Sequence, residues 1–242
     1  MRALRAPAMT RALVGCLGFG LCAQPLGAGA TERTVDARGR PARWLEPTVT
    51  LRLADHDGVE EERMRAADQA ARSAAISWSS ACSRAVIRVG EPARGYFGAV
   101  RDGVNTVTFL ATSWCRAGRR ANGCYPRAEM AVTTVYFNSC SPANREASLA
   151  EVDVEINAVD YDWFGDDPGK RPPPVELMTL LAHELGHALG LGHAQPNRAG
   201  WRGPGAHPSS TIMTTAAHQG AEPAVKTPSP ADRKSLCAIY PR

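Results

Sequence analysis

The chain has 242 residues, of which 44% are hydrophobic and 6% aromatic, and its formal net charge is +4. That length suits one large domain or two small ones, with enough apolar sequence for a sizeable core. Three arginines lie in the first 30 residues, so the rest of the chain has 25 basic residues against 24 acidic ones. A net charge of about +1 gives no support for binding to nucleic acid.

Residues 1–30 have the pattern of a secretory signal peptide. The three arginines lie before or at the start of a short apolar stretch over 12–21, and an Ala-Gly-Ala sequence ends at residue 30 as a cleavage site. The apolar stretch is too short to span a membrane, and no later stretch is long enough. Cys16 offers a lipoprotein anchor as the less favoured alternative. We therefore expect a secreted protein, extracellular or periplasmic, with no membrane span.

Seven cysteines become five once residues 1–30 are removed, and export to an oxidising compartment favours disulfides. Cys115 and Cys124 lie close together in the sequence, across a loop rich in glycine and arginine, and are the first expected pair. Cys82 and Cys237 each fall at a predicted helix and are a second candidate pair, which would tie the two ends of the chain together. An odd count leaves one thiol over.

The first half of the chain after residue 30 predicts the order strand, helix, strand, strand. Residues 31–41 are polar and contain glycine and proline, so they predict a short flexible lead-in or pro-segment. Apolar and polar residues alternate over 49–53, which indicates a half-buried strand, and apolar residues recur at helical spacing over 58–78. Two further strands are expected over 85–89 and 105–110.

The second half predicts two more strands, a loop and two helices. The strands cover 131–137 and 150–156, and a loop with four aspartates and three consecutive prolines follows over 160–174. A helix over 175–189 then ends at a glycine. A final helix begins after Ser229 as its N-cap, with proline at its first position and aspartate at its third. No interior linker divides this order, which is typical of one α/β domain.

The strongest motif spans residues 183–193 and reads HELGHALGLGH. His183 and His187 are four residues apart, so both imidazoles project from one face of the predicted helix, with Glu184 beside them. A glycine then ends the helix and lets the chain return, so that His193 becomes a third ligand. Three neutral imidazoles leave one zinc position open, as in catalytic rather than structural sites. A water there becomes a nucleophile at neutral pH, and Glu184 is expected to act as general base in peptide hydrolysis.

The motif resembles that of the metzincin zinc peptidases, and among these the chain is most similar to the matrixins. Metzincins have a methionine turn beneath the zinc, and the sequence Ser-Thr-Ile-Met that ends at Met213 resembles it. The likeness covers roughly residues 42–242 and includes an edge strand over 131–137 that pairs with substrate. The resemblance implies an α/β catalytic domain with a twisted, mainly parallel five-stranded sheet, an active-site helix, a methionine turn and a C-terminal helix. It also implies one catalytic zinc, with Met213 as structural support.

The sequence departs from the matrixin pattern at several positions. Ala194 follows the third ligand where matrixins usually have serine, and no tyrosine lies two residues after Met213, which argues against the astacin-like and serralysin-like branches. The histidine- and aspartate-rich loop of a second zinc has no counterpart before Ala131. No cysteine between 31 and 81 can act as an inhibitory latch. Asp36 is an alternative latch, although an exposed aspartate is the favoured interpretation.

Several alternatives stay open from the sequence alone. We expect a monomer that acts on protein or peptide substrates. A catalytically silent zinc-binding or adhesion protein of the same fold is one alternative, and a metallohydrolase of non-peptide amides is another. Calcium is a second candidate metal for the acidic loop, although a solvated turn is favoured there. The aspartates of that loop are Asp160, Asp162, Asp166 and Asp167.

Overall fold

The structure of the protein is a computed structural model. It describes residues 32–46, 48–55, 61–82, 84–95, 98–116, 123–138, 146–165, 169–173, 175–194, 211–214 and 226–241. The predicted signal peptide with Cys16, and also Cys140, lie outside the described residues. Among the helices that are described, none is long and apolar enough to cross a membrane.

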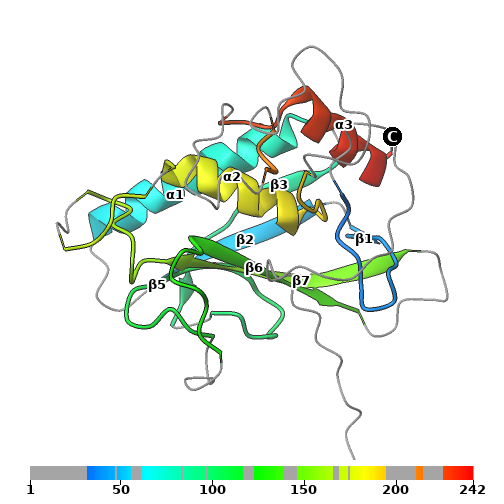
Figure 1. Ribbon diagram of the computed structural model, residues 1–242. Coiled ribbons are helices and arrows are strands. Elements are labelled where there is room, and N and C mark those ends of the chain that lie inside the picture. Colours follow the sequence, from blue (N-terminus) through cyan, green and yellow to red (C-terminus); the bar gives the residue numbers. More distant parts are fainter. Residues whose placement is uncertain are drawn as a thin grey trace, which may run out of the picture.

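A seven-stranded, mostly parallel sheet forms one layer of the molecule (Figure 1). Its strands are β1 (Ala42–Arg43), β2 (Thr48–Asp55), β3 (Val86–Val89), β4 (Ala93–Arg94), β5 (Asn105–Leu110), β6 (Ala131–Phe137) and β7 (Ala147–Asn157). The longer strands lie in the order β3-β2-β5-β7-β6, and only the pairing of β6 with β7 is antiparallel. All five predicted strands are present. The sheet has seven strands rather than five because the two-residue strands β1 and β4 pair with β7 and β2.

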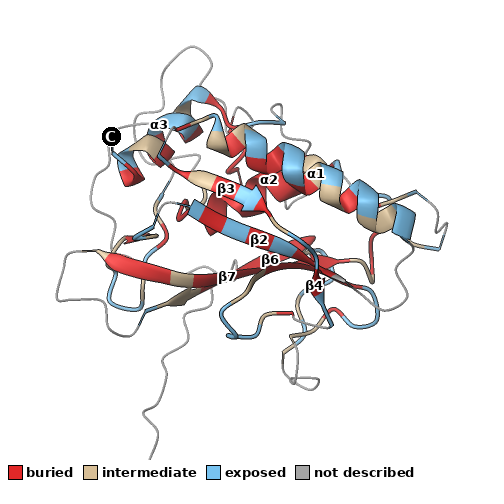
Figure 2. Ribbon diagram, turned by 180° about the vertical axis from the view of Figure 1, so that it is seen from behind, coloured by how far each residue is buried: buried red, intermediate tan, exposed pale blue. Residues whose placement is uncertain are grey.

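Two helices lie side by side on one face of the sheet (Figure 1). They are α1 (Glu61–Ser79) and α2 (Leu177–Ala188), and a third helix, α3 (Pro230–Ile239), follows near the C-terminus. The outer side of α1 is exposed while its inner side is buried (Figure 2). Small alanines on that inner side allow a close approach, and Trp78 Nε1 donates to the Ala182 carbonyl of α2 at 2.6 Å. The two helices are thus packed tightly, with α1 over β3 and α2 over β6 at the sheet edge.

The sheet face away from the helices holds buried carboxylates. Val152, Val154 and Ile156 of β7 belong to the hydrophobic core, so the residues that alternate with them along the strand point to the other face. Those residues include Glu151 and Glu155, which are 2% and 0% exposed. Backbone N–H groups of loop residues 102 and 103 donate to Glu151 at 2.9 and 2.7 Å, and the Tyr125 hydroxyl donates to Glu155 at 2.6 Å. Loops therefore cover this face, which explains why β7 is buried on both sides.

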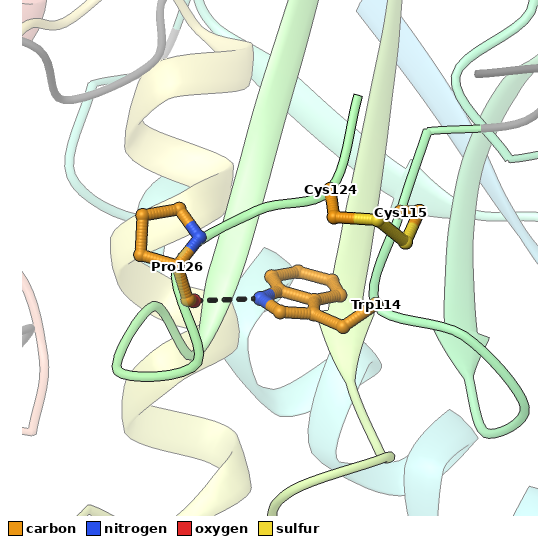
Figure 3. Close-up of a disulfide and its surroundings, with 4 residues drawn as sticks. All are labelled: Trp114, Cys115, Cys124 and Pro126. Atoms are coloured by element: carbon orange, nitrogen blue, oxygen red, sulfur yellow. Dashed lines mark hydrogen bonds between the residues drawn. A yellow bond between two sulfur atoms is a disulfide. The ribbon is translucent and has the colours of Figure 1, made fainter. Parts of the chain in front are cut away.

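A disulfide closes the loop that follows β5. Cys115 and Cys124 are bonded, which confirms the first expected pair. Trp114 lies beside the disulfide, and its Nε1 donates to the Pro126 carbonyl at 3.0 Å (Figure 3). The disulfide and the tryptophan together hold residues 114–116 and 123–126 on the sheet face away from the helices.

The second candidate cysteine pair is close in space but is not bonded. Cys237 Sγ lies 3.6 Å from the Ala81 carbonyl, and Cys82 Sγ lies 3.8 Å from the Tyr240 carbonyl. The end of α1 and the C-terminal helix α3 therefore meet as expected. Cys82 and Cys237 form no disulfide with each other, so the prediction of a second disulfide between them is wrong.

Candidate metal centre

Helix α2 carries His183, Glu184 and His187, and its end turns the chain towards His193. The Gly190 N–H donates to the His187 carbonyl at 2.9 Å, and the next N–H, that of Leu191, donates to the Gly186 carbonyl at 3.0 Å. This pair of bonds is a Schellman motif, which needs a left-handed residue after the helix. Gly190 meets that need with φ at 91°.

The three histidines converge through their Nε2 atoms. Nε2 of His187 lies 3.0 Å from Nε2 of His183 and 3.2 Å from Nε2 of His193. All three donor atoms lie within 4.8 Å of one another, and within the described part of the chain no other three His, Cys, Asp or Glu side chains do so. The structure thus brings together the three residues that the motif predicts as metal ligands.

Backbone carbonyls orient two of the imidazoles. His183 Nδ1 lies 2.7 Å from the Ile212 carbonyl oxygen, and His187 Nδ1 lies 2.9 Å from that of Leu191. A carbonyl can only accept, so each Nδ1 carries the proton and each Nε2 presents a lone pair to the cluster. Burial lowers the pKa of His187 to about 4, although its bond to the Leu191 carbonyl opposes this, so the ring is neutral at pH 7.

The chemistry of this donor set fits one zinc ion. Nitrogen lone pairs that face one another at such short distances repel unless a cation lies between them. Zinc accepts neutral imidazole nitrogens, and its histidine ligands usually donate their other N–H to a backbone carbonyl or a carboxylate. His183 and His187 both meet that second condition. A cluster of three histidines can therefore hold a metal ion here.

Glu184 lies next to the cluster without belonging to it. Its side chain is buried, and the Thr133 hydroxyl of β6 donates to its Oε2 at 2.5 Å. Burial raises the pKa of Glu184 to about 7, although the bond from Thr133 opposes the shift. A cation held by the histidines would favour the charged carboxylate. The sequence predicted Glu184 as a base but gave no sign that Thr133 orients it.

Met213 lies against α2 and is fully buried. A Cβ atom added to Gly186 would lie 2.3 Å from Met213 Sδ and 2.9 Å from Trp78 Cζ2. The absence of a side chain at Gly186 therefore lets the methionine lie against the helix backbone next to the histidines. The sequence did not single out Gly186. The sequence did contain an indication of this contact. A glycine inside a helix costs about 1 kcal/mol relative to alanine, and it often marks a position where another group lies close to the helix backbone.

Asp232 supports the turn that contains Met213. Its carboxylate accepts the Thr211 hydroxyl and, at 3.1 Å, the Ile212 N–H. It also accepts the Ser229 N–H at 2.9 Å, while Ser229 Oγ accepts the Asp232 N–H at 3.2 Å. This reciprocal capping box confirms the predicted start of α3. The contact with the turn that contains Met213 is a second role for Asp232 that the sequence did not predict.

Asp36 lies in a turn of its own. Its Oδ1 accepts the N–H groups of Arg38 and Arg40, each at 2.9 Å, and its Oδ2 accepts the Arg40 guanidinium at 2.8 Å. Hydrogen bonds from the arginines hold the pKa of Asp36 below its usual value, although burial opposes them as the largest single effect. The Asp36 side chain is only 10% exposed, so the favoured interpretation of an exposed aspartate is wrong, and with both oxygens engaged in this turn the latch has no support either.

The described aspartates of the acidic loop also have protein partners. Asp160 is buried and accepts the Arg127 guanidinium at 2.6 and 2.7 Å. Asp162 accepts the N–H groups of the second and third residues after it, at 3.1 and 2.9 Å. Asp166 and Asp167 lie outside the described residues. The two described aspartates thus form an ion pair and a turn, and give calcium binding no support.

No family model matches the sequence, and a comparison with curated proteins finds no similar sequence. The function is therefore inferred from the geometry of the site. The resemblance of the eleven-residue motif to that of the matrixins remains a prediction from the sequence.

Proposed function

We propose that this protein is an exported zinc-dependent endopeptidase of the matrixin type. The observation that carries the proposal is the convergence of three Nε2 atoms beside a buried glutamate. His183 and His187 are buried but His193 is partly exposed, so the cluster can be reached from the surface on the side of His193. Three imidazoles with one accessible side suit a catalytic zinc better than a structural one.

Glu184 supplies the acid–base chemistry in this proposal. When bound, zinc acts as a Lewis acid that polarises a carbonyl and lowers the pKa of a water ligand to roughly 7. Thr133 fixes one oxygen of Glu184, so the carboxylate is oriented before substrate arrives. Glu184 then takes a proton from the attacking water and delivers one to the leaving amine.

Strand β6 offers a surface for an extended peptide. Within the described residues β6 pairs only with β7, so its other edge has backbone groups available for hydrogen bonds. Thr133 in the middle of β6 contacts Glu184, so this edge lies beside the base. A peptide that binds as an added strand would run next to the base, which favours protein or peptide substrates over small amides.

Removal of zinc should abolish the cleavage of unfolded protein. The chain from residue 31 onwards would be incubated with a fluorescently labelled unfolded protein, with and without a chelator. Cleavage should stop after chelation and return with one equivalent of zinc, because the described donor set fits a single ion. Fluorescence release measures the rate, and mass spectrometry of the protein measures the metal content.

The result of this zinc-removal experiment also distinguishes the peptidase from the two alternative functions. A zinc-loaded protein that cleaves no unfolded protein would contradict the peptidase and favour a silent zinc-binding or adhesion protein. Cleavage restricted to small amides would favour a metallohydrolase of non-peptide substrates. Cleavage that persists once zinc is measurably absent would exclude a role for the metal.

Replacing Thr133 with valine should lower kcat about tenfold and leave KM nearly unchanged. Valine keeps the shape of the side chain but removes the donor to Glu184, and a hydrogen bond to a charged group is worth about 1.5–3 kcal/mol. Serine at this position keeps the hydroxyl and should restore most of the rate. Initial rates over a range of substrate concentrations separate kcat from KM.

Thr134 provides the matched control in the same strand. Its hydroxyl oxygen accepts the Arg116 guanidinium at 2.6 Å on the opposite side of β6, away from Glu184. Thr134→Val should therefore alter stability while kcat stays near the wild-type value. Similar losses of kcat in Thr133→Val and Thr134→Val would show a general effect on the strand and reject the specific role of Thr133.

A further inference from the structure

We propose that residues 32–34 of the lead-in are part of the metal site, because they hold the loop that carries His193 and because Thr34 shares a hydrogen-bond acceptor with His187. The inference rests on the proposed zinc site. It gives a function to a segment that the sequence predicts as a flexible lead-in or pro-segment. Removal of this segment should weaken zinc binding rather than activate the protein.

The loop that carries His193 needs support from outside α2. The turn at Gly190 ends the helix, and His193 follows three residues later, outside any helix or strand. On one side the Ala194 N–H donates to the Met213 carbonyl at 2.8 Å, and Ala194 forms a parallel bridge with Thr214. The methionine turn thus holds the far end of the loop, and the lead-in lies along the rest of it.

The lead-in runs antiparallel to the His193 loop. The Thr34 N–H donates to the Gly190 carbonyl at 2.9 Å, and the Gly192 N–H donates to the Glu32 carbonyl at 2.5 Å. The Glu32 N–H donates to the carbonyl of His193 itself at 3.3 Å. A Cβ atom at Gly192 would lie 3.2 Å from the Glu32 carbonyl oxygen, so the two backbones are in close contact.

Thr34 also connects the lead-in to a second ligand. Its hydroxyl donates to the Leu191 carbonyl at 3.2 Å, and the same carbonyl accepts the His187 Nδ1 proton at 2.9 Å. Thr34 is 5% exposed and Leu191 is 0% exposed, so water does not compete for these bonds. Two donors fix the direction of this carbonyl and, through it, the orientation of His187. The loss of a direct partner of a metal ligand typically weakens metal binding 10- to 100-fold, and Thr34 acts one bond further out, through the Leu191 carbonyl, so the lower end of that range is expected for it.

The lead-in is itself anchored to the sheet. The Ala42 N–H, at the start of β1, donates to the Thr34 carbonyl at 2.7 Å, and β1 pairs with β7. Arg33 Nη2 lies 3.1 Å from Glu146 Oε1, and Arg43 Nε lies 2.7 Å from the other oxygen of that carboxylate. The segment therefore connects the edge of the sheet to the third ligand. A flexible lead-in would contact neither the sheet edge nor the loop that carries His193.

The test compares zinc affinity in two variants of one side chain. Thr34→Val removes the hydroxyl and should raise the zinc dissociation constant about tenfold, whereas Thr34→Ser keeps the hydroxyl and should stay close to wild type. A chain that begins at residue 42 should bind zinc at least about 100-fold more weakly than the wild type. Competition with a coloured chelator measures the affinity. Absorption of the cobalt-substituted protein reports separately whether the third imidazole still binds.

Ser79 gives a control for simple loss of stability. Its hydroxyl donates to the Ile87 carbonyl and accepts the Ile87 N–H, both at 3.0 Å, between the end of α1 and β3, so Ser79→Ala removes at least as much hydrogen bonding as Thr34→Val. This variant should unfold at lower denaturant concentration with its zinc affinity unchanged. Wild-type affinity in Thr34→Val, or an equal loss in Ser79→Ala, would overturn the proposal. Since zinc binding is measured without substrate, absence of peptidase activity alone would leave this result intact.

Discussion

Replacing Glu184 with glutamine should lower the rate of peptide hydrolysis by about 10²- to 10⁴-fold and leave zinc bound. The amide has nearly the same shape as the carboxylate, and its oxygen can still accept the Thr133 hydroxyl. An amide cannot take up a proton at neutral pH, so the step assigned to Glu184 is lost. Zinc should remain because the three histidines supply the converging donor atoms. Initial rates with an unfolded protein substrate, together with the zinc content, measure both effects.

A second variant separates the base from the ligands. His187→Ala should lose zinc and activity together, because it removes one of three donors. A Glu184→Gln protein that cleaves as fast as the wild type would exclude Glu184 as the base. A Glu184→Gln protein that loses zinc would instead indicate that the carboxylate is a ligand.

The parts of the site that follow from helix periodicity were predictable from the sequence. The four-residue spacing of His183 and His187 fixes their common face on any helix, and Gly190 marks the end of that helix. The structure has both features, and His193 joins the cluster as expected. The five longer strands were likewise identifiable from short apolar or alternating runs. These features depend on residues close together in the sequence, where local geometry leaves few choices.

The parts of the site that depend on contacts distant in sequence were not predictable. Thr133 and Glu184 are 51 residues apart, and Thr34 and Leu191 are 157 apart. The sequence does not distinguish a strand threonine that contacts Glu184 from one that does not. It likewise does not distinguish a polar lead-in that packs beside the metal site from one that is free of it. The buried carboxylates of β7 were missed for the same reason, since only the folded loops satisfy them. Asp232 was recognised as part of a helix cap but not as a partner of the turn that contains Met213.

Replacing Asp232 with alanine should destabilise the protein by about 3–5 kcal/mol, the largest loss of stability that we expect from a single change here. The carboxylate is 0% exposed and accepts the Thr211 hydroxyl and the N–H groups of Ile212 and Ser229. Alanine leaves these three buried donors without their acceptor, and each such group costs about 1–3 kcal/mol. Urea unfolding of the zinc-free protein measures the loss without interference from the metal.

The same variant should also weaken zinc binding, because Ile212 lies between Asp232 and the metal site. The Ile212 N–H donates to Asp232 and its carbonyl accepts the His183 Nδ1 proton, so a displaced turn moves a ligand. Ser229→Ala removes only the other half of the capping box and should cost about 1 kcal/mol with zinc affinity unchanged. If Asp232→Ala is no more harmful than Ser229→Ala in both measurements, Asp232 is only a helix cap. A loss confined to Asp232→Ala means that one carboxylate both starts α3 and holds the turn that orients His183.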